Sequence, residues 1–258
     1  MSPAEQDRSF AGLPVTVLGV RVHPLRPDEL FEGVGRLLQA GEKSLVTYVN
    51  VHTLNLAAND ARLREAHARS SLTYCDGAGV VLGARLLGRS LPGRMTSASF
   101  IDGFCERWRG EGRRLYFLGG RPGVAEQACR VLRERHPGLG IAGCAHGYFR
   151  RNHAEEDEVL QAIAAARPDI LFVGFGTPAQ ERWVLDNWQR IDARVVWPIG
   201  ALVDYLSGAV PRAPEWMLQN GLEWLFRLAV EPRRLFARYL VGNPLFLYRV
   251  LRERIGRR

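Results

Sequence analysis

The sequence predicts an α/β fold with a largely parallel sheet that is covered by helices on both faces. Apolar, β-branched segments alternate along the chain with segments of helical periodicity, which is typical of repeated β-α-β units. The predicted strands are continuously apolar, as expected of parallel strands that are buried on both faces. With 258 residues, of which 47% are hydrophobic and 24% charged, the chain is long enough to enclose a substantial core.

The expected elements follow one another from the N-terminal part of the chain. Residues 13–22 predict one strand, and residues 26–41 predict a helix with Asp28 near its start and Gly41 after its end. Residues 44–57 predict a β-branched strand that runs into a helix. Further strands are expected within residues 71–77, 113–120, 140–149, 169–176 and 194–200, and further helices within residues 60–70, 79–88, 97–112, 123–138 and 155–168.

Several classes of protein are excluded by simple features of the chain. Residues 1–12 lack a basic start followed by an apolar run, so we expect no secretory signal. No window of about 18 uninterrupted apolar residues exists, so we expect no transmembrane helix. Cys75, Cys105, Cys129 and Cys144 are spaced singly, which favours reduced, buried thiols in a cytoplasmic protein over a zinc site or a disulfide scaffold.

The net charge of +8 comes almost entirely from arginine, because Lys43 is the single lysine. Residues 211–258 contain ten arginines and four glutamates, so +6 of that charge lies in the last fifth of the chain. A basic segment of this kind predicts a polyanionic partner: nucleic acid, acidic lipid or a phosphorylated substrate.

Turns rich in glycine and polar residues follow the predicted strands. Ligands of open parallel sheets bind at the carboxyl ends of the strands. Glycines there let backbone amides approach phosphate oxygens, and we therefore expect Gly119, Gly120 and Gly176 to contact substrate. Together the turns predict a nucleotide- or phosphate-binding crevice. They are VNVHT (49–53), CDGAG (75–79), LGGRPG (118–123), HGYF (146–149), GFGTPAQE (174–181) and PIGALVD (198–204).

The same turns argue against the common nucleotide cofactors. Residues 118–128 carry GGxxG rather than GxGxxG, and the next strand ends without an acidic residue, which excludes a nicotinamide cofactor. No GxxxxGK[ST] loop is present, which excludes a P-loop NTPase. No Asp-x-Asp pair is present, and the acidic residues 155–158 begin a helix, where they favour its dipole. We therefore expect neither a metal nor a cofactor, so the arginines of the tail would neutralise a bound diphosphate.

Asp76 places a carboxylate at the end of an apolar strand. A buried carboxylate is costly unless it is paired or hydrogen-bonded, so Asp76 is either satisfied structurally or kept for chemistry. Taken alone, Asp76 fits a helix cap at the strand exit better than a catalytic group.

Seven segments together resemble the WecG/TagA/CpsF glycosyltransferases, in family order over residues 15–251. The resemblance implies an inverting, metal-independent transfer of a sugar from a UDP-sugar to a polyprenyl-diphosphate-linked sugar, and the best-known members use UDP-N-acetylmannosamine. It also implies a Rossmann-like sheet with a C-terminal helical appendage that touches the membrane. The segments are YCDGAGVVLGARLLG (74–88), GRMTSASFIDGF (93–104), LYFLGGRPGVAEQA (115–128), HGYF (146–149), LFVGFGTPAQERWV (171–184), PIGALVDYLSGAVPRAPEWMLQNGLEWLFRL (198–228) and EPRRLFARYLVGNP (231–244).

The resemblance gives Asp76 the role of general base, which removes the proton of the acceptor hydroxyl as that oxygen attacks the anomeric carbon. Its apolar neighbours are expected to raise its pKa toward the range in which a carboxylate is an effective base. Arg227, Arg234 and Arg238 match arginines that close over the diphosphate, where guanidinium groups pair bidentately with phosphate oxygens. The remaining tail arginines, Arg249, Arg252, Arg254, Arg257 and Arg258, fit a solvated or membrane-facing surface better.

Further positions are expected to contact substrate, and several have a structural alternative. Asn50 matches an asparagine of the family but also fits a buried turn amide, and either Tyr48 or Thr47 stands in the place of a nearby threonine. The other expected contacts are Arg94, Tyr148, Gln180, Glu181 and Asp204, of which Glu181 also fits a helix N-terminal acid and Asp204 a helix cap. Ser99 stands where the family usually has aspartate, which implies a different acceptor or sugar specificity.

We expect a catalytic core over residues 1–208 and a basic, amphipathic helical appendage over residues 209–258. Apolar residues recur in the appendage at helical spacing beside arginines, which favours binding to anionic lipids of the inner leaflet at the cytoplasmic face of the cell membrane. Packing on the core or a subunit interface, and hence a homo-oligomer, remain alternatives for this segment.

Other readings of the whole chain are less favoured. Another UDP-hexose such as UDP-glucose, used for an exopolysaccharide, is the alternative donor. A nucleic-acid-binding protein lacks support because no RNP, KH or helix-turn-helix signature is present. A noncatalytic membrane scaffold would leave Asp76 and the glycine turns without a purpose.

Overall fold

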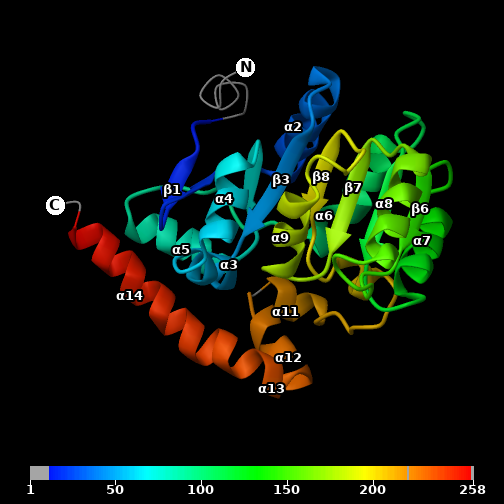
Figure 1. Ribbon diagram of the computed structural model, residues 1–258. Helices are drawn as coiled ribbons and strands as arrows, with labels where there is room; N and C mark the ends of the chain where they lie inside the picture. Colours follow the sequence, from blue (N-terminus) through cyan, green and yellow to red (C-terminus); the bar gives the residue numbers. More distant parts are fainter. Residues whose placement is uncertain (1–11, 220, 257–258) are drawn as a thin grey trace.

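The computed structural model describes residues 12–219 and 221–256, and these form an α/β fold around one central sheet (Figure 1). All neighbouring strands of this sheet are parallel, in the order β4-β3-β8-β7-β5-β6. The predicted Rossmann-like, parallel architecture is therefore confirmed. The strands are β3 (Ser44–Val49), β4 (Leu72–Cys75), β5 (Leu115–Gly119), β6 (Ile141–Ala145), β7 (Ile170–Gly174) and β8 (Val195–Pro198).

Helices connect the strands and cover both faces of the sheet, as the alternating sequence pattern predicts (Figure 1). They are α2 (Pro27–Ala40), α3 (Val51–Ala57), α4 (Ala61–Arg69), α5 (Ala78–Leu86), α6 (Ser97–Trp108), α7 (Val124–Arg135), α8 (Ala154–Ala166), α9 (Ala179–Asp186) and α10 (Leu202–Leu206).

The prediction of a single strand over residues 13–22 is wrong. The chain forms an antiparallel pair there, with β1 at Val15–Val17 and β2 at Val20–Val22. Leu18 and Gly19 between them have φ values of 49° and 80°. Two consecutive positive φ angles make the tight two-residue turn that matches the twist of a hairpin. Glycine adopts this conformation freely, but leucine rarely does. The sequence of residues 13–22 therefore carries no clear turn signal and predicts one strand.

The strands bury alternate side chains on opposite faces of the sheet. On one face, Phe172 of β7 and Trp197 of β8 pack against Phe104 of α6. On the other face, Val173 of β7 lies in a second cluster with Trp183 of α9. Because both faces are covered, the strand sequences are apolar throughout and show no polar alternation.

The C-terminal segment consists of α11 (Glu215–Gln219), α12 (Glu223–Val230), α13 (Pro232–Phe236), a π-helical turn η1 (Ala237–Val241) and α14 (Gly242–Ile255). In Figure 1 the strand arrows point toward α11–α13, and α14 runs along α3 and α5. These helices therefore cover the carboxyl ends of β3 and β4.

Helix α14 packs on the core, which is one of the roles left open by the sequence. Phe246 and Val250 are buried in a cluster that includes Leu54 of α3 and Val80 of α5. A Cβ atom at Gly83 would lie 2.6 Å from the Phe246 ring, so this glycine allows the two helices to approach closely. The outward side of the segment carries exposed apolar side chains, namely Leu225, Val230, Phe236, Leu240, Val241, Leu245, Tyr248, Leu251 and Ile255. Within residues 12–219 and 221–256, no helix combines the length and apolar character needed to cross a bilayer.

Candidate active site

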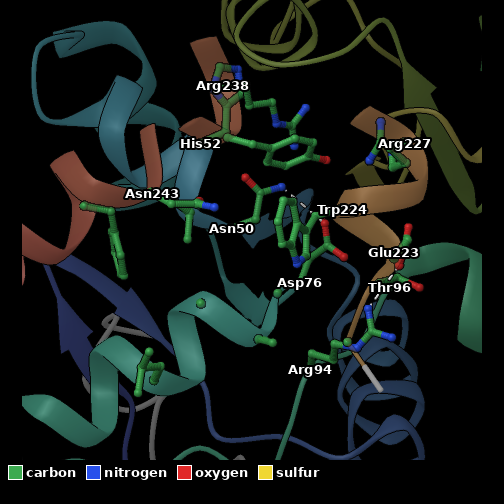
Figure 2. A pocket seen from close by; sticks show the side chains of 18 of the residues that line it. Asn50, His52, Asp76, Arg94, Thr96, Glu223, Trp224, Arg227, Arg238 and Asn243 are labelled. Atoms are coloured by element: carbon green, nitrogen blue, oxygen red, sulfur yellow. Dashed lines mark hydrogen bonds and ion pairs between the residues drawn. The ribbon is translucent and has the colours of Figure 1, made fainter. Parts of the chain in front are cut away.

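A cavity of about 310 Å³ lies at the carboxyl ends of β3 and β4, beneath the C-terminal helices. This volume suits a small-molecule ligand. Figure 2 shows side chains that reach it from the strand exits, from the turn before α6 and from the C-terminal helices. Its polar lining consists of Asn50, His52, Asp76, Arg94, Thr96, Glu223, Trp224, Arg227, Arg238, Tyr239 and Asn243. The cavity therefore unites Asn50, Asp76, Arg94, Arg227 and Arg238 among the predicted site residues.

Asp76 is half-buried at the exit of β4, where its backbone N–H donates to the carbonyl of Val49 on β3 (2.8 Å). Burial raises the pKa of its carboxyl group to about 7. The hydrogen bond from Asn50 opposes this rise, Glu223 adds to it, and the charges of Arg227 and Arg238 oppose it. A carboxyl group that titrates near neutral pH can accept a proton from a substrate hydroxyl at physiological pH.

Asn50 both caps a helix and contacts Asp76. Its Oδ1 accepts a hydrogen bond from the backbone N–H of Thr53 (3.0 Å), and Thr53 Oγ1 accepts one from the backbone N–H of Asn50 (2.8 Å). This reciprocal capping at the start of α3 leaves Nδ2 to donate to Oδ2 of Asp76 across 3.3 Å. The two roles considered for Asn50, turn amide and site residue, are therefore compatible.

Two arginines of the C-terminal segment line the cavity opposite Asp76. The Arg227 guanidinium lies 5.8 Å from the centre of the Tyr205 ring, and that of Arg238 lies 5.6 Å from the centre of the Tyr239 ring. The buried Nε atom of each has no hydrogen-bond partner among the described residues. Both side chains therefore keep donors for an anionic ligand. The side chain of Arg234 lies outside what the structure describes, so its predicted role stays a prediction.

Arg94 has partners of its own within the cavity wall. Its Nη1 lies 3.0 Å from Oε2 of Glu223, and its Nη2 donates to the carbonyl oxygen of Leu218. Arg94 thus joins the turn before α6 to α11 and α12. Ser99, where the family usually has aspartate, exchanges capping hydrogen bonds with Thr96 at the start of α6 and does not line the cavity.

Tyr48, Gln180 and Glu181 form a buried network that does not line the cavity. Nε2 of Gln180 donates to the Tyr48 hydroxyl (3.2 Å) and to Oε1 of Glu181 (2.8 Å), while Oε1 of Gln180 accepts from the backbone N–H of Gly200 (3.1 Å). The network joins the exits of β3, β7 and β8. In this structure the network holds the carboxyl ends of these strands together, and the Gln180 side chain is fully buried.

Two further predicted contacts lie away from the cavity. The Thr47 hydroxyl is enclosed and bonds to Ser70 (3.0 Å) and Thr73 (3.0 Å), so the structure gives no support to a substrate contact there. Tyr148 lies in the loop after β6 and is 67% exposed.

The remaining predicted contacts are Asp204 and three glycines, and none of them lines the cavity. Asp204 belongs to α10. A Cβ atom at Gly119 would lie 2.6 Å from the carbonyl oxygen of Gly174, so this glycine lets β5 and β7 approach at their exits. Gly120 and Gly176 adopt positive φ values of 68° and 79° in the turns that follow.

Several residues of the cavity are not predicted from the sequence. Glu223 and Trp224 lie within the GLEWLFRL stretch, and His52 lies in the VNVHT turn, but no pattern singles them out. Burial, together with the charge of Arg238, lowers the pKa of His52 to about 4, so this imidazole is neutral at neutral pH. Within the described part of the chain, no three His, Cys, Asp or Glu side chains are grouped to hold a metal ion.

A carboxyl group that titrates near pH 7, opposite two guanidinium groups with free donors, defines an enzyme site for an anionic substrate. The family model described as "Glycosyl transferase WecG/TagA/CpsF family" matches residues 15–258, and the chain belongs to this family of glycosyltransferases. Similar curated proteins come from Staphylococcus aureus strains MRSA252, NCTC 8325 / PS 47 and COL. Each is 25% identical over 242 residues, which cover 93% of either chain. Each is named N-acetylglucosaminyldiphosphoundecaprenol N-acetyl-beta-D-mannosaminyltransferase.

Proposed function

We propose that this glycosyltransferase moves N-acetylmannosamine from a UDP-sugar onto the N-acetylglucosamine of a diphosphate-linked polyprenol. The names of the Staphylococcus aureus relatives supply the transferred sugar and the acceptor, and the family resemblance supplies UDP as the carrier. The observation that carries the proposal is the position of Asp76, hydrogen-bonded to an oriented Asn50 and facing Arg227 and Arg238 across one cavity.

In the proposed reaction, Asp76 accepts the proton of an acceptor hydroxyl while that oxygen forms a bond to the anomeric carbon of the donor sugar. The bond between this carbon and the β-phosphate oxygen of UDP breaks, and its electron pair leaves with UDP. Arg227 and Arg238 stabilise the negative charge that develops on the leaving diphosphate. A single displacement of this kind inverts the configuration at the anomeric carbon and leaves Asp76 protonated.

The arginines also support a metal-independent reaction, because bidentate guanidinium–phosphate pairs neutralise charge that other transferases neutralise with a divalent ion. The exposed apolar side chains of α12–α14, with Arg252 and Arg254 beside them, support docking to an anionic leaflet. We propose that the enzyme is a peripheral membrane protein, and that it works at the cytoplasmic face of the cell membrane, where it would meet a lipid-linked acceptor.

The test is transfer from UDP-N-acetylmannosamine to an N-acetylglucosaminyl-diphosphate prenol, in excess EDTA, with the product identified by mass spectrometry. UDP-N-acetylglucosamine and UDP-glucose serve as competing donors, and Asp76→Asn as the inactive control. The proposal predicts a disaccharide from UDP-N-acetylmannosamine alone. Preferential use of UDP-glucose would overturn the donor assignment, and activity that EDTA abolishes and magnesium or manganese restores would overturn the role of the arginines.

A further inference from the structure

The cavity has an apolar end that the proposed chemistry leaves unused. At this end the lining residues are Val51 of α3, Ala78, Gly79 and Leu82 of α5, and Phe246 and Leu247 of α14. Asp76 lines the same cavity two residues before α5 begins, so a ligand held at Asp76 can also reach this apolar end.

Two leucines at this end are open to solvent although they lie in a concave site. Leu82 is 46% exposed and Leu247 is 38% exposed, and they come from the helices α5 and α14, which pack against each other. The remainder of the apolar end is made by Val51 of α3, by small residues at the start of α5 and by the buried ring of Phe246. Apolar surface of this kind is stabilised when an apolar ligand displaces water from it.

The apolar end also continues outward along α14. Leu251, one turn beyond Leu247, and Tyr248, the residue next to Leu247, are exposed on the same helix. A ligand that enters the apolar end can therefore extend along an apolar path to the surface of the C-terminal segment.

We propose that the apolar end of the cavity, between α5 and α14, binds the first isoprenoid units of the acceptor. This inference rests on the proposed function. The acceptor carries a sugar hydroxyl at one end and an apolar chain at the other, and the cavity offers a base at Asp76 and an apolar wall on α5 and α14. With the hydroxyl at Asp76, the chain is directed past Leu82 and Leu247, while Arg227 and Arg238 face the diphosphate of the donor.

The test uses N-acetylglucosaminyl diphosphates carrying either a farnesyl or a methyl group, assayed in solution without membranes. Leu82→Gln and Leu247→Gln should each raise the KM for the farnesyl acceptor about tenfold, because polar atoms would then line an apolar subsite. The kcat, the KM for the UDP-sugar and the KM for the methyl acceptor should not change. Leu13→Gln is the matched control, since Leu13 is 73% exposed and lies outside the cavity.

Folding is checked separately by circular dichroism and thermal melting, and both substituted leucines are partly exposed, so the variants should melt like the parent protein. A photoreactive group on the first isoprene unit gives a second readout, with labelling expected on peptides of α5 and α14. Labelling confined to other segments, or farnesyl KM values within twofold of the parent, would overturn the inference while leaving the proposed function intact.

Two further outcomes separate a failure of this inference from a failure of the proposed function. If added phospholipid vesicles competitively raise the farnesyl KM of the parent protein, the apolar end belongs to membrane lipid and the inference is overturned. If the parent protein transfers sugar to neither acceptor, the proposed function fails, and the inference falls with it.

Discussion

Nδ2 of Asn50 donates a hydrogen bond to Oδ2 of Asp76 across 3.3 Å, while Oδ1 of the same amide accepts from the backbone N–H of Thr53. The helix cap fixes one side of the amide, so the other side must present its donor to the carboxylate. Folding of α3 therefore orients the hydrogen bond that faces the proposed base.

Asn50→Asp should move the acid limb of the pH–rate profile toward higher pH by about one unit. Aspartate keeps the capping acceptor of α3, but it removes the donor to Asp76 and adds a like charge beside it, which favours the protonated form of Asp76. The measurement is kcat against pH. The matched control is Asp60→Asn, which exchanges the capping residue of α4 outside the cavity and should leave the limb in place. An unchanged profile in Asn50→Asp would contradict the coupling.

Asp76→Asn should raise the melting temperature at pH 8. The folded-state pKa of about 7 lies above the ordinary value of 3.8, so ionised Asp76 is less favourable in the folded than in the unfolded chain. This destabilisation is complete above pH 7, shrinks as the pH falls and is absent below 3.8, where both states are protonated. The melting temperatures of variant and parent should therefore converge in acid.

The control for this measurement is Asp28→Asn, at an exposed position in the first turn of α2. A carboxylate there favours the helix dipole, so this variant should lose stability at pH 8 rather than gain it. If Asp76→Asn melts at or below the temperature of the parent at pH 8, the burial argument for Asp76 is wrong.

Arg227→Ala and Arg238→Ala should each lower kcat by about 10²–10³, because each removes a donor from the developing charge on the leaving diphosphate. Lysine at either position should restore only part of the rate, since its ammonium group cannot pair bidentately with phosphate. Arg254→Ala, at an exposed position near the end of α14, is the control and should keep the parent kcat with a soluble acceptor. Equal rates for all three variants would contradict the proposed role of the cavity arginines.

Gly83→Ala and Gly103→Ala should change stability in opposite directions. Both glycines lie inside helices, but a Cβ atom at Gly83 meets the Phe246 ring at 2.6 Å, whereas one at Gly103 meets Phe31 at 3.7 Å. Overpacking at Gly83 should cost about 1–3 kcal/mol of unfolding free energy. At Gly103, the better helix propensity of alanine should add up to about 1 kcal/mol. Chemical denaturation measures both, and a stabilised Gly83→Ala would show that α14 does not pack tightly on α5.

The sequence predicts the fold well because the arrangement of a parallel sheet is visible in continuous apolar strands between helical segments. It misses the hairpin at Leu18 and Gly19, since a leucine at positive φ leaves no turn signal in an apolar run. The apolar rows of the tail are visible as well, but the sequence does not separate Phe246, which is buried against the core, from its neighbour Leu247, which is 38% exposed.

For the site, the strand exits identify Asn50 and Asp76 as candidates, and the charge of the tail identifies its arginines. Which exits share a cavity depends on the strand order, and this order places the neighbours β3 and β4 beneath the tail. Gln180 also follows the end of a strand, β7, but both the nitrogen and the oxygen of its side-chain amide form hydrogen bonds within the fold. Glu223 could not be predicted from the sequence, because it is tied to the cavity by Arg94, which is distant in sequence. In the fold, Nη1 of Arg94 lies 3.0 Å from Oε2 of Glu223.

The most direct test of the central claim is the kcat of Asp76→Asn at pH 8, with UDP-N-acetylmannosamine and a soluble N-acetylglucosaminyl-diphosphate acceptor. Asparagine keeps the shape of the side chain but cannot take up the proton of the acceptor hydroxyl. If Asp76 is the general base, kcat should fall by about 10²–10⁴ while the binding of the UDP-sugar stays unchanged. A variant that binds the donor normally and transfers sugar at the parent rate would contradict the assignment of Asp76 as the base.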